Sequence, residues 1–285
     1  MLEEQIHQFI GGVFLLPTGE IEGDVLRGEI RLFENAGRPT RRLSGADLER
    51  VEEVVFEWAS EMLLGEKGGE HPSQPDEDTE SGEFLDTLRG HKGEVYAVAV
   101  TNDGTRIVSG GLDDTVRLWD ARSGEPVDTL QDHTGAVYAV AVTTDGARIV
   151  SGGDGGTVRL WDARSGELLH TFRGHKGAVH AVAATNDGTR IVSGGHEGTV
   201  RLWDARSGEP LHTFRGHEGA VFAVAVTNDG TRIASGGDDG TVRLWDARSG
   251  ELLDTLQGHE DSVFAVAVTN DGTRIVSGGH DGTVR

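Results

Sequence analysis

Cysteine is absent from this chain of 285 residues, and no long hydrophobic run occurs in it. Without cysteine the chain forms neither disulfides nor thiolate metal sites, although this fits either side of a membrane. The longest apolar stretch, near Phe9–Leu16, is too short to span a bilayer. The acidic start, Met1 to Glu4, lacks the basic n-region of a signal peptide. We therefore expect a soluble, cytoplasmic protein.

Positive charge is also scarce. The chain carries 26 basic and 48 acidic residues, a net charge of −22, of which −13 falls on residues 1–83 and −9 on residues 84–285. Both parts would repel phosphates and anionic lipids, so we expect neither nucleic acid nor a membrane surface as partner.

What the chain does contain is a repeat. The segment Ser81–His91 reads SGEFLDTLRGH, and Ser249–His259 reads SGELLDTLQGH, with three further copies between them. The copies follow at steps of 42 residues, marked by His91, His133, His175, His217 and His259. A fixed period of about 40–45 residues indicates an array of small units, each burying its faces against its neighbours.

Each unit has the same internal order of short apolar runs and turns. The first contains the runs Glu83–Leu88, Val95–Val100, Arg106–Ser109 and Thr115–Trp119, separated by Gly-rich turns. Four short strands joined by tight turns predict one antiparallel sheet. Such sheets bury their faces by packing radially into a β-propeller. The predicted fold is therefore mainly β, a propeller of four-stranded antiparallel blades.

The pairs Gly90-His91 and Trp119-Asp120, which recur in phase, resemble the WD-repeat (WD40) family. The resemblance covers 81–285, with repeats at about 81–122, 123–164, 165–206, 207–248 and a truncated 249–285. It implies a hydrogen-bonded set of histidine, serine, acid and tryptophan in each blade. The corresponding residues are His91, Ser109, Asp113 and Trp119; His133, Ser151 and Trp161; His175, Ser193, Glu197 and Trp203; His217, Ser235, Asp239 and Trp245; and His259, Ser277 and Asp281.

The second set is incomplete, because Gly155 stands where the acid is expected. Buried polar groups without partners cost about 1–3 kcal/mol each, so we expect the second blade to be locally weaker. A histidine, serine and aspartate also suggest a catalytic triad, but five copies of a catalytic set make no chemical sense. We therefore predict a structural role, no catalytic residues and no enzyme.

The point at which the repeat begins and ends along the sequence affects how the ring of blades could close. The run Glu83–Leu88 opens the array as an orphan strand, and the family resemblance implies that it completes the last blade and clasps the ring. The sequence stops at Arg285, where the other units continue Leu-Trp-Asp. The alternatives are a truncated record, a tight five-blade ring, or an open arc that forms homo-oligomers through its exposed edges.

Positions that differ between the copies mark the candidate binding surface. The resemblance places two such columns on the top face, around the central channel, where the family binds peptides or partner loops. They are Tyr96, Tyr138, His180, Phe222 and Phe264, and Leu112, Asp154, His196, Asp238 and His280. Aromatic residues ringed by charges suit protein recognition, although drift between duplicated copies is the alternative. The histidines lie on different units, so we predict no metal and no cofactor.

Residues 1–64 predict a small α/β or α+β module of unknown type, joined by the flexible acidic linker 65–80. Leu2, Ile6 and Ile10 have helical spacing, Val13–Leu16 and Glu29–Phe33 predict strands, and 45–64 predicts an amphipathic helix. We expect a non-catalytic scaffold that binds proteins or peptides in signalling or complex assembly. The alternative is a sensor array that regulates an N-terminal effector or enzyme.

Overall fold

The computed structural model describes residues 8–10, 13–15, 29–34, 83–269 and 272–285, and every regular element in these ranges is a β-strand. Four antiparallel four-stranded sheets and the start of a fifth, here called blades one to five, follow each other along the chain. The predicted helix at 45–64 and the linker at 65–80 lie outside these ranges. No helix among the described residues is long and apolar enough to cross a membrane.

The blades share one topology, in which the strands lie side by side in chain order. Blade one contains β5 (Val95–Val100), β6 (Arg106–Gly111), β7 (Thr115–Asp120) and β8 (Pro126–Gln131). Blade two contains β9 (Val137–Val142), β10 (Arg148–Gly153), β11 (Thr157–Asp162) and β12 (Leu168–Arg173). Blade three contains β13 (Val179–Ala184), β14 (Arg190–Gly195), β15 (Thr199–Asp204) and β16 (Pro210–Arg215).

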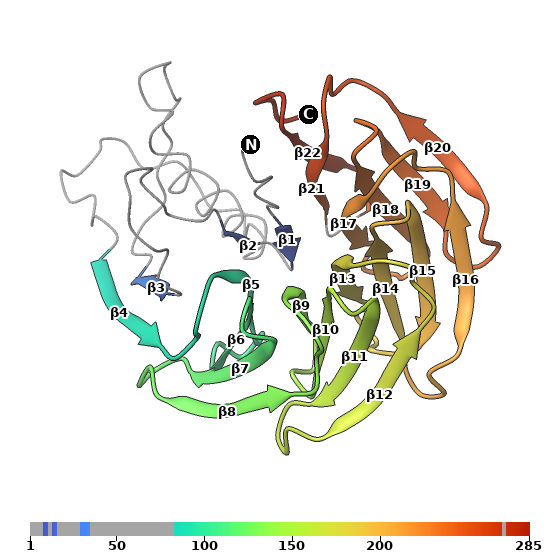
Figure 1. Ribbon diagram of the computed structural model, residues 1–285. Coiled ribbons are helices and arrows are strands. Elements are labelled where there is room, and N and C mark those ends of the chain that lie inside the picture. The colour runs from blue at the N-terminus through green and yellow to red at the C-terminus, as the bar shows by residue number, and fades with distance from the viewer. Residues whose placement is uncertain (1–7, 11–12, 16–28, 35–82, 270–271) are drawn as a thin grey trace, which may run out of the picture.

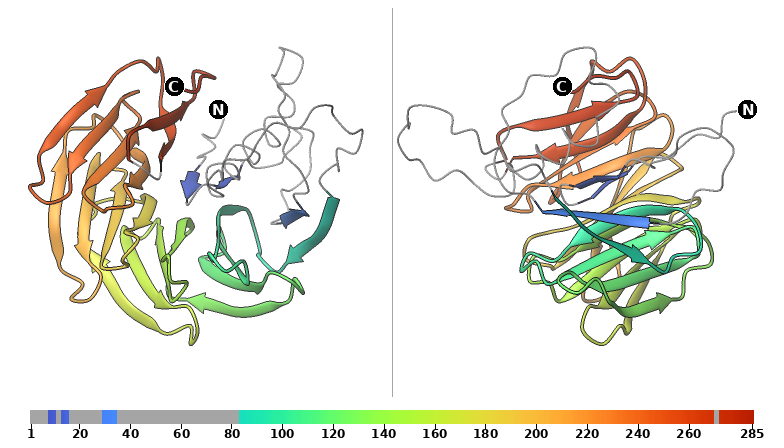
Figure 2. Two further views of the ribbon diagram at one scale, coloured as in Figure 1. Left: turned by 180° about the vertical axis from the view of Figure 1, so that it is seen from behind. Right: turned by 90° about the vertical axis from the view of Figure 1, so that its left-hand side faces the viewer.

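Blade four contains β17 (Val221–Val226), β18 (Arg232–Gly237), β19 (Val242–Asp246) and β20 (Leu252–Leu256). Blade five pairs β21 (Val263–Val268) with β22 (Ile275–Gly279), and a single bridge joins Gly278 to Val284. The blades stand around an arc, with the first strand of each at the centre and the fourth on the circumference (Figure 1). Figure 2 shows the same arc from behind.

The blades pack closely because glycines on one sheet lie against valines on the next sheet. Val137 and Val179, on the inner strands of blades two and three, are fully buried. A Cβ at Gly110 would lie 2.6 Å from Val137 Cγ1, and one at Gly152 would lie 2.6 Å from Val179 Cγ1. The repeated Ser-Gly-Gly therefore brings each sheet against its neighbour at a distance that a larger side chain would prevent.

The prediction that the first strand completes the last blade and closes the ring is wrong. The strand β4 (Glu83–Arg89) pairs with β3 (Glu29–Glu34), not with blade five. Leu88 on β4 packs instead against blade one, in one buried cluster with Trp119. Five blades bend through an arc that leaves β4 and β22 apart (Figure 1), so β4 lies beside blade one rather than beside the last sheet.

The N-terminal strands were predicted in part. The structure forms β2 (Val13–Leu15) and β3 where the sequence predicts strands. Ile10 lies in β1 (Gln8–Ile10), which pairs with β2, so this residue is in a strand and not in a helix, while Leu2 and Ile6 lie outside the described residues. The strand β1 lies at the centre of the arc beside the inner strands of all five blades.

The two ends of the arc expose faces that are covered elsewhere. Val95 in blade one and Val276 in blade five are half-buried. Their counterparts Val137 and Val150 in blade two are fully buried. Association of copies through these edges stays a prediction.

Candidate functional site

Two faces of the arc differ in what they carry. The top face is formed by the turns that precede each inner strand and those between the second and third strands, such as 90–94 and 112–114 in blade one. The bottom face is formed by the opposite turns, such as 101–105 and 121–125. The strands alternate in direction, so each blade contributes two turns to each face.

A chain of hydrogen bonds links the top face to the core of each complete blade. In blade one the Trp119 indole N–H donates to Ser109 Oγ at 2.8 Å, and Ser109 Oγ lies 2.8 Å from His91 Nε2. The His91 Nδ1 lies 2.8 Å from Asp113 Oδ1. Burial lowers the pKa of His91, which favours the neutral imidazole. In the neutral ring Nδ1 carries the proton and donates to Asp113, while Ser109 donates to Nε2.

The carboxylic acid that ends each hydrogen-bonded series stays ionised. In blade four, burial alone would raise the pKa of Asp239, but hydrogen bonds from His217, the Glu218 N–H and Thr241 outweigh it and lower the pKa to about 2. Blade three uses Glu197 instead of aspartate. Its Oε1 lies 2.7 Å from His175 Nδ1. Against the opposing effect of burial, the hydrogen bonds from His175 and Thr199 lower the pKa of Glu197 to about 2.

Blade two lacks the acid, as the sequence indicates. His133 Nε2 lies 2.7 Å from Ser151 Oγ, and the Trp161 indole donates to the same oxygen at 2.8 Å. His133 Nδ1 is buried without a hydrogen-bond partner. Burial, reinforced by the nearby Arg159 charge, lowers the pKa of His133 to about 3. A neutral N–H is thus left unsatisfied in the interior of blade two.

We predict that Gly155→Asp stabilises the protein by about 1–2 kcal/mol at pH 7, because the new carboxylate accepts from His133 Nδ1. Gly155 has no positive φ, and Asp113 and Asp239 occupy the same position in blades one and four. The new Cβ would meet only the exposed Thr134 hydroxyl closely, at 2.8 Å. Urea unfolding measures the gain, and Gly155→Ala is the control, because it adds the Cβ without a hydrogen-bond acceptor.

The same variant reduces sensitivity to acid. The pKa of His133 is about 3 in the folded chain against 6.5 for the free group, so the unfolded chain binds a proton first as the pH falls. This contribution is complete above pH 6.5 and falls by roughly 2 kcal/mol by pH 5. The introduced carboxylate would raise the pKa of His133 and shrink that loss. Equal losses of stability in the variant and the parent from pH 7 to 5 would contradict this account.

Five aromatic rings form a continuous row along the inner edge of the top face, here called the aromatic ladder. One ring comes from each inner strand: Tyr96, Tyr138, His180, Phe222 and Phe264. Successive ring centroids lie 5.3, 5.4, 5.5 and 5.1 Å apart, all in tilted geometry. Such tilted contacts favour aromatic pairs by about 0.5–1.5 kcal/mol beyond their burial. The ladder therefore couples each blade to the next at the top face.

His180 differs from the other four rings. It is 2% exposed and lies between Tyr138 and Phe222, so it braces the ladder instead of facing a partner. Burial and the neighbouring His196 lower the pKa of His180 to about 4. Its Nε2 lies 3.3 Å from His196 Nδ1. The four other rings are half-buried.

The second predicted column contacts the ladder through two ring pairs, His196 with His180 and His280 with Phe264. All five of its residues are exposed: Leu112, Asp154, His196, Asp238 and His280. Leu112 is 48% exposed, like Val100 and Leu253 elsewhere on the surface, so its exposure alone does not mark a contact. Asp238 accepts a hydrogen bond from Ser262 Oγ at 2.7 Å across blades four and five. The His280 ring packs against Phe264 with 5.7 Å between centroids.

Two acidic residues contact members of these columns, and sequence reasoning missed one of them, Asp261. Tyr96 donates its hydroxyl hydrogen bond to Glu94 Oε2 at 2.5 Å. His280 Nδ1 lies 3.3 Å from Asp261 Oδ2. The signal for Asp261 was its departure from glycine, which occupies that position in the other four copies: Gly93, Gly135, Gly177 and Gly219.

Charge is distributed unevenly along the top face. The first and third blades expose Lys92 and Lys176 at the position after the network histidine. The fourth and fifth expose Glu218 and Glu260 there, next to the carboxylates of Asp238 and Asp261. Among the residues that the structure describes, no group of histidines and acids is arranged to hold a metal ion.

Repeated four-stranded blades stapled by a tryptophan, serine and histidine set define a repeat protein of the propeller class. The family model "WD domain, G-beta repeat" matches residues 82–120, 124–162, 166–204, 208–246 and 250–285. The chain belongs to the WD-repeat family, and it is accordingly a protein-interaction scaffold.

Two curated relatives match a short segment. One is "Eukaryotic translation initiation factor 3 subunit I" of Phaeosphaeria nodorum, 42% identical over 45 residues. The other is the protein of the same name from Nematostella vectensis, 48% identical over 40 residues. These matches cover 16% and 14% of the chain, and 14% and 12% of the relatives.

Proposed function

We propose that the top face grips an extended segment of a partner protein, and that the chain performs no catalysis there. The observation that carries the proposal is the aromatic ladder with its exposed second column, a half-buried apolar strip flanked by charge. In protein interfaces a few central side chains, often aromatic, supply much of the binding energy, and a polar rim surrounds them. The setting that we propose is assembly of a complex, or signalling, in the cytoplasm.

The charge of the face favours a partner segment that is basic where it meets blades four and five. Glu218, Asp238, Glu260 and Asp261 all lie there. Complementary charge mainly sets specificity and the rate of association. The short match to proteins named as subunits of a translation initiation factor supports a role within a larger complex.

The test reverses charge on one face at a time. Glu218→Lys with Glu260→Lys changes two exposed top-face side chains, and only the backbone N–H groups of these residues bond to the blade network. Glu167→Lys with Glu251→Lys makes the same change on exposed bottom-face turns. We expect the top-face pair to weaken binding of a captured partner at least about tenfold. Equal binding by both pairs would refute the top-face proposal.

A second candidate function is regulation of an N-terminal module by the array. It is favoured by the pairing of β3 with β4 and by the position of β1 beside the inner strands. Assaying residues 1–80 alone for folding and activity distinguishes the two. An inactive, unfolded fragment would rule out the regulated module and favour the scaffold proposal.

A further inference from the structure

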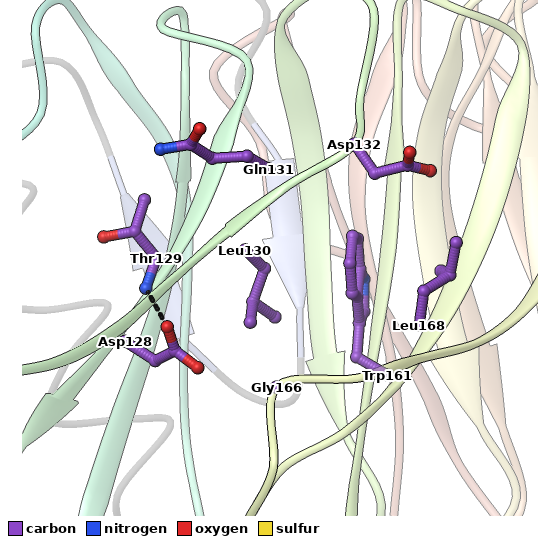
Figure 3. Close-up of a pocket in the computed structure, with 8 residues that line it drawn as sticks. All are labelled: Asp128, Thr129, Leu130, Gln131, Asp132, Trp161, Gly166 and Leu168. Atoms are coloured by element: carbon purple, nitrogen blue, oxygen red, sulfur yellow. Dashed lines mark hydrogen bonds between the residues drawn. The ribbon is translucent and has the colours of Figure 1, made fainter.

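A pocket opens on the circumference of the arc, between blades one and two (Figure 3). It holds about 540 Å³ and lies between β8 and the turn that joins β11 to β12. Figure 3 shows Trp161 between Leu130 and Leu168, with Asp128 and Asp132 at opposite ends. The other lining residues are Thr129, Gln131 and Gly166.

The next two blade interfaces show what this pocket lacks. Between blades two and three, Phe172 packs on Trp203 with 5.6 Å between centroids, and His170 Nε2 lies 2.8 Å from the carbonyl oxygen of Arg206. Between blades three and four, Phe214 packs on Trp245 at 5.4 Å, and His212 Nε2 lies 2.9 Å from the Arg248 carbonyl. Each of these interfaces is filled by a flat ring and by a nitrogen donor.

Blade one carries Leu130 and Asp128 at those two positions. Leucine is smaller than phenylalanine, and a carboxylate cannot donate a hydrogen bond to the neighbouring turn. A Cβ at Gly166 would lie only 2.2 Å from Asp128 Oδ2, so the carboxylate lies directly against that turn. The first interface is therefore missing a flat group that carries N–H donors.

The charge of the pocket also favours a group that carries N–H donors. Asp132 replaces the glycine that the other four units have at this position: Gly90, Gly174, Gly216 and Gly258. Asp132 Oδ2 lies 2.8 Å from Arg159 Nε, so that pair is neutral as a whole. Asp128 accepts a hydrogen bond from the Thr129 N–H at 2.7 Å, and it forms no ion pair within the described part of the chain. One negative charge is left at the mouth of the pocket.

We propose that this pocket binds the guanidinium group of an arginine side chain from a partner protein. A guanidinium is flat, always charged and carries donors in a fork, which suits it to pack near Trp161 while it bonds to Asp128. It supplies the plane and the N–H donors that Phe172 and His170 supply one blade further on. The site is on the circumference and does not depend on the top face.

The test uses Nα-acetyl-arginine amide and follows the Trp161 indole N–H in a ¹H–¹⁵N spectrum, assigned with Trp161→Phe. We expect a saturable shift with a dissociation constant on the order of 1 mM, the range of a single side chain. Nα-acetyl-citrulline amide has the same shape without the charge and should bind at least about fivefold more weakly. The peptide acetyl-Gly-Arg-Gly amide should bind more tightly than Nα-acetyl-arginine, because the free carboxylate of Nα-acetyl-arginine is repelled by Asp128 and has no ammonium beside it to offset the repulsion.

Three variants complete the test. Asp128→Asn should weaken binding of the arginine amide at least about fivefold, while Asp254→Asn, the same change at the matching position of β20, should leave it unchanged. Asp128→His with Leu130→Phe fills the pocket with residues that the next interfaces already accommodate, and should abolish the shift without lowering the thermal midpoint. The proposal is overturned by equal binding of arginine and citrulline amides, by tighter binding of Nα-acetyl-arginine than of the peptide, or by wild-type binding in the filled variant.

Discussion

Ser193→Ala is expected to destabilise the protein by roughly 2–5 kcal/mol, because it leaves two buried polar groups without partners at about 1–3 kcal/mol each. Ser193 is fully buried. Its Oγ accepts from the Trp203 indole at 2.8 Å and lies 2.8 Å from His175 Nε2. Alanine has nearly the same volume, so the loss reports the hydrogen bonds rather than a cavity.

Urea unfolding of the whole chain measures this loss, and hydrogen exchange locates it. We expect the amides of β14 and β15 to exchange faster than those of β18 and β19. Ser207→Ala is the matched control, because Ser207 lies on an exposed bottom-face turn and should change stability by only about 0.5 kcal/mol. Equal effects of the two substitutions would mean that the tryptophan–serine–histidine chain does not stabilise the blade.

Gly152→Ala is expected to cost about 1–3 kcal/mol by overpacking the interface between blades two and three. The added Cβ would lie 2.6 Å from Val179 Cγ1 and 3.0 Å from Val182 Cγ1. Val179 is fully buried and Val182 is 2% exposed, so neither valine has space into which it can move. The measurement is again the free energy of unfolding, with exchange of β10 and β13 amides as the local readout.

Gly155→Ala provides the control in the same blade, where the nearest atom is the exposed Thr134 hydroxyl. This substitution should be neutral, or stabilising by a few tenths of a kcal/mol through the unfolded chain. Adding Val179→Ala to Gly152→Ala should recover part of the loss, because it removes the methyl groups that clash. Wild-type stability of Gly152→Ala would show that the sheets approach less closely than the structure requires.

The blades could be predicted from the sequence because their information is local and repeated. The inner strand Val95–Val100 lies where its apolar run predicts it. The partners of Ser109 and Asp113 could be named in advance through the family resemblance. The absence of an acid in blade two was visible as Gly155, since four sister copies showed what was missing.

Features that depend on the relation between distant segments could not be predicted. The closing role expected of β4 failed because pairing with β3 depends on how the whole arc bends, which no single repeat encodes. His180 looked like one member of a variable column, but its burial is set by Tyr138 and Phe222 on neighbouring blades. The circumferential pocket depends on Leu130 and Trp161, which come from different units and meet only when the blades stack.

The central claim is that the top face is the surface that holds the partner, and site-specific photo-crosslinking tests it most directly. A photoreactive residue would replace Leu112 or His196 on the top face, and Arg122 or Arg206 on the bottom face, all of them exposed. We predict discrete crosslinked partner products from positions 112 and 196 and none from positions 122 and 206. Crosslinks to the same partner from the bottom-face positions, with none from the top, would contradict the account.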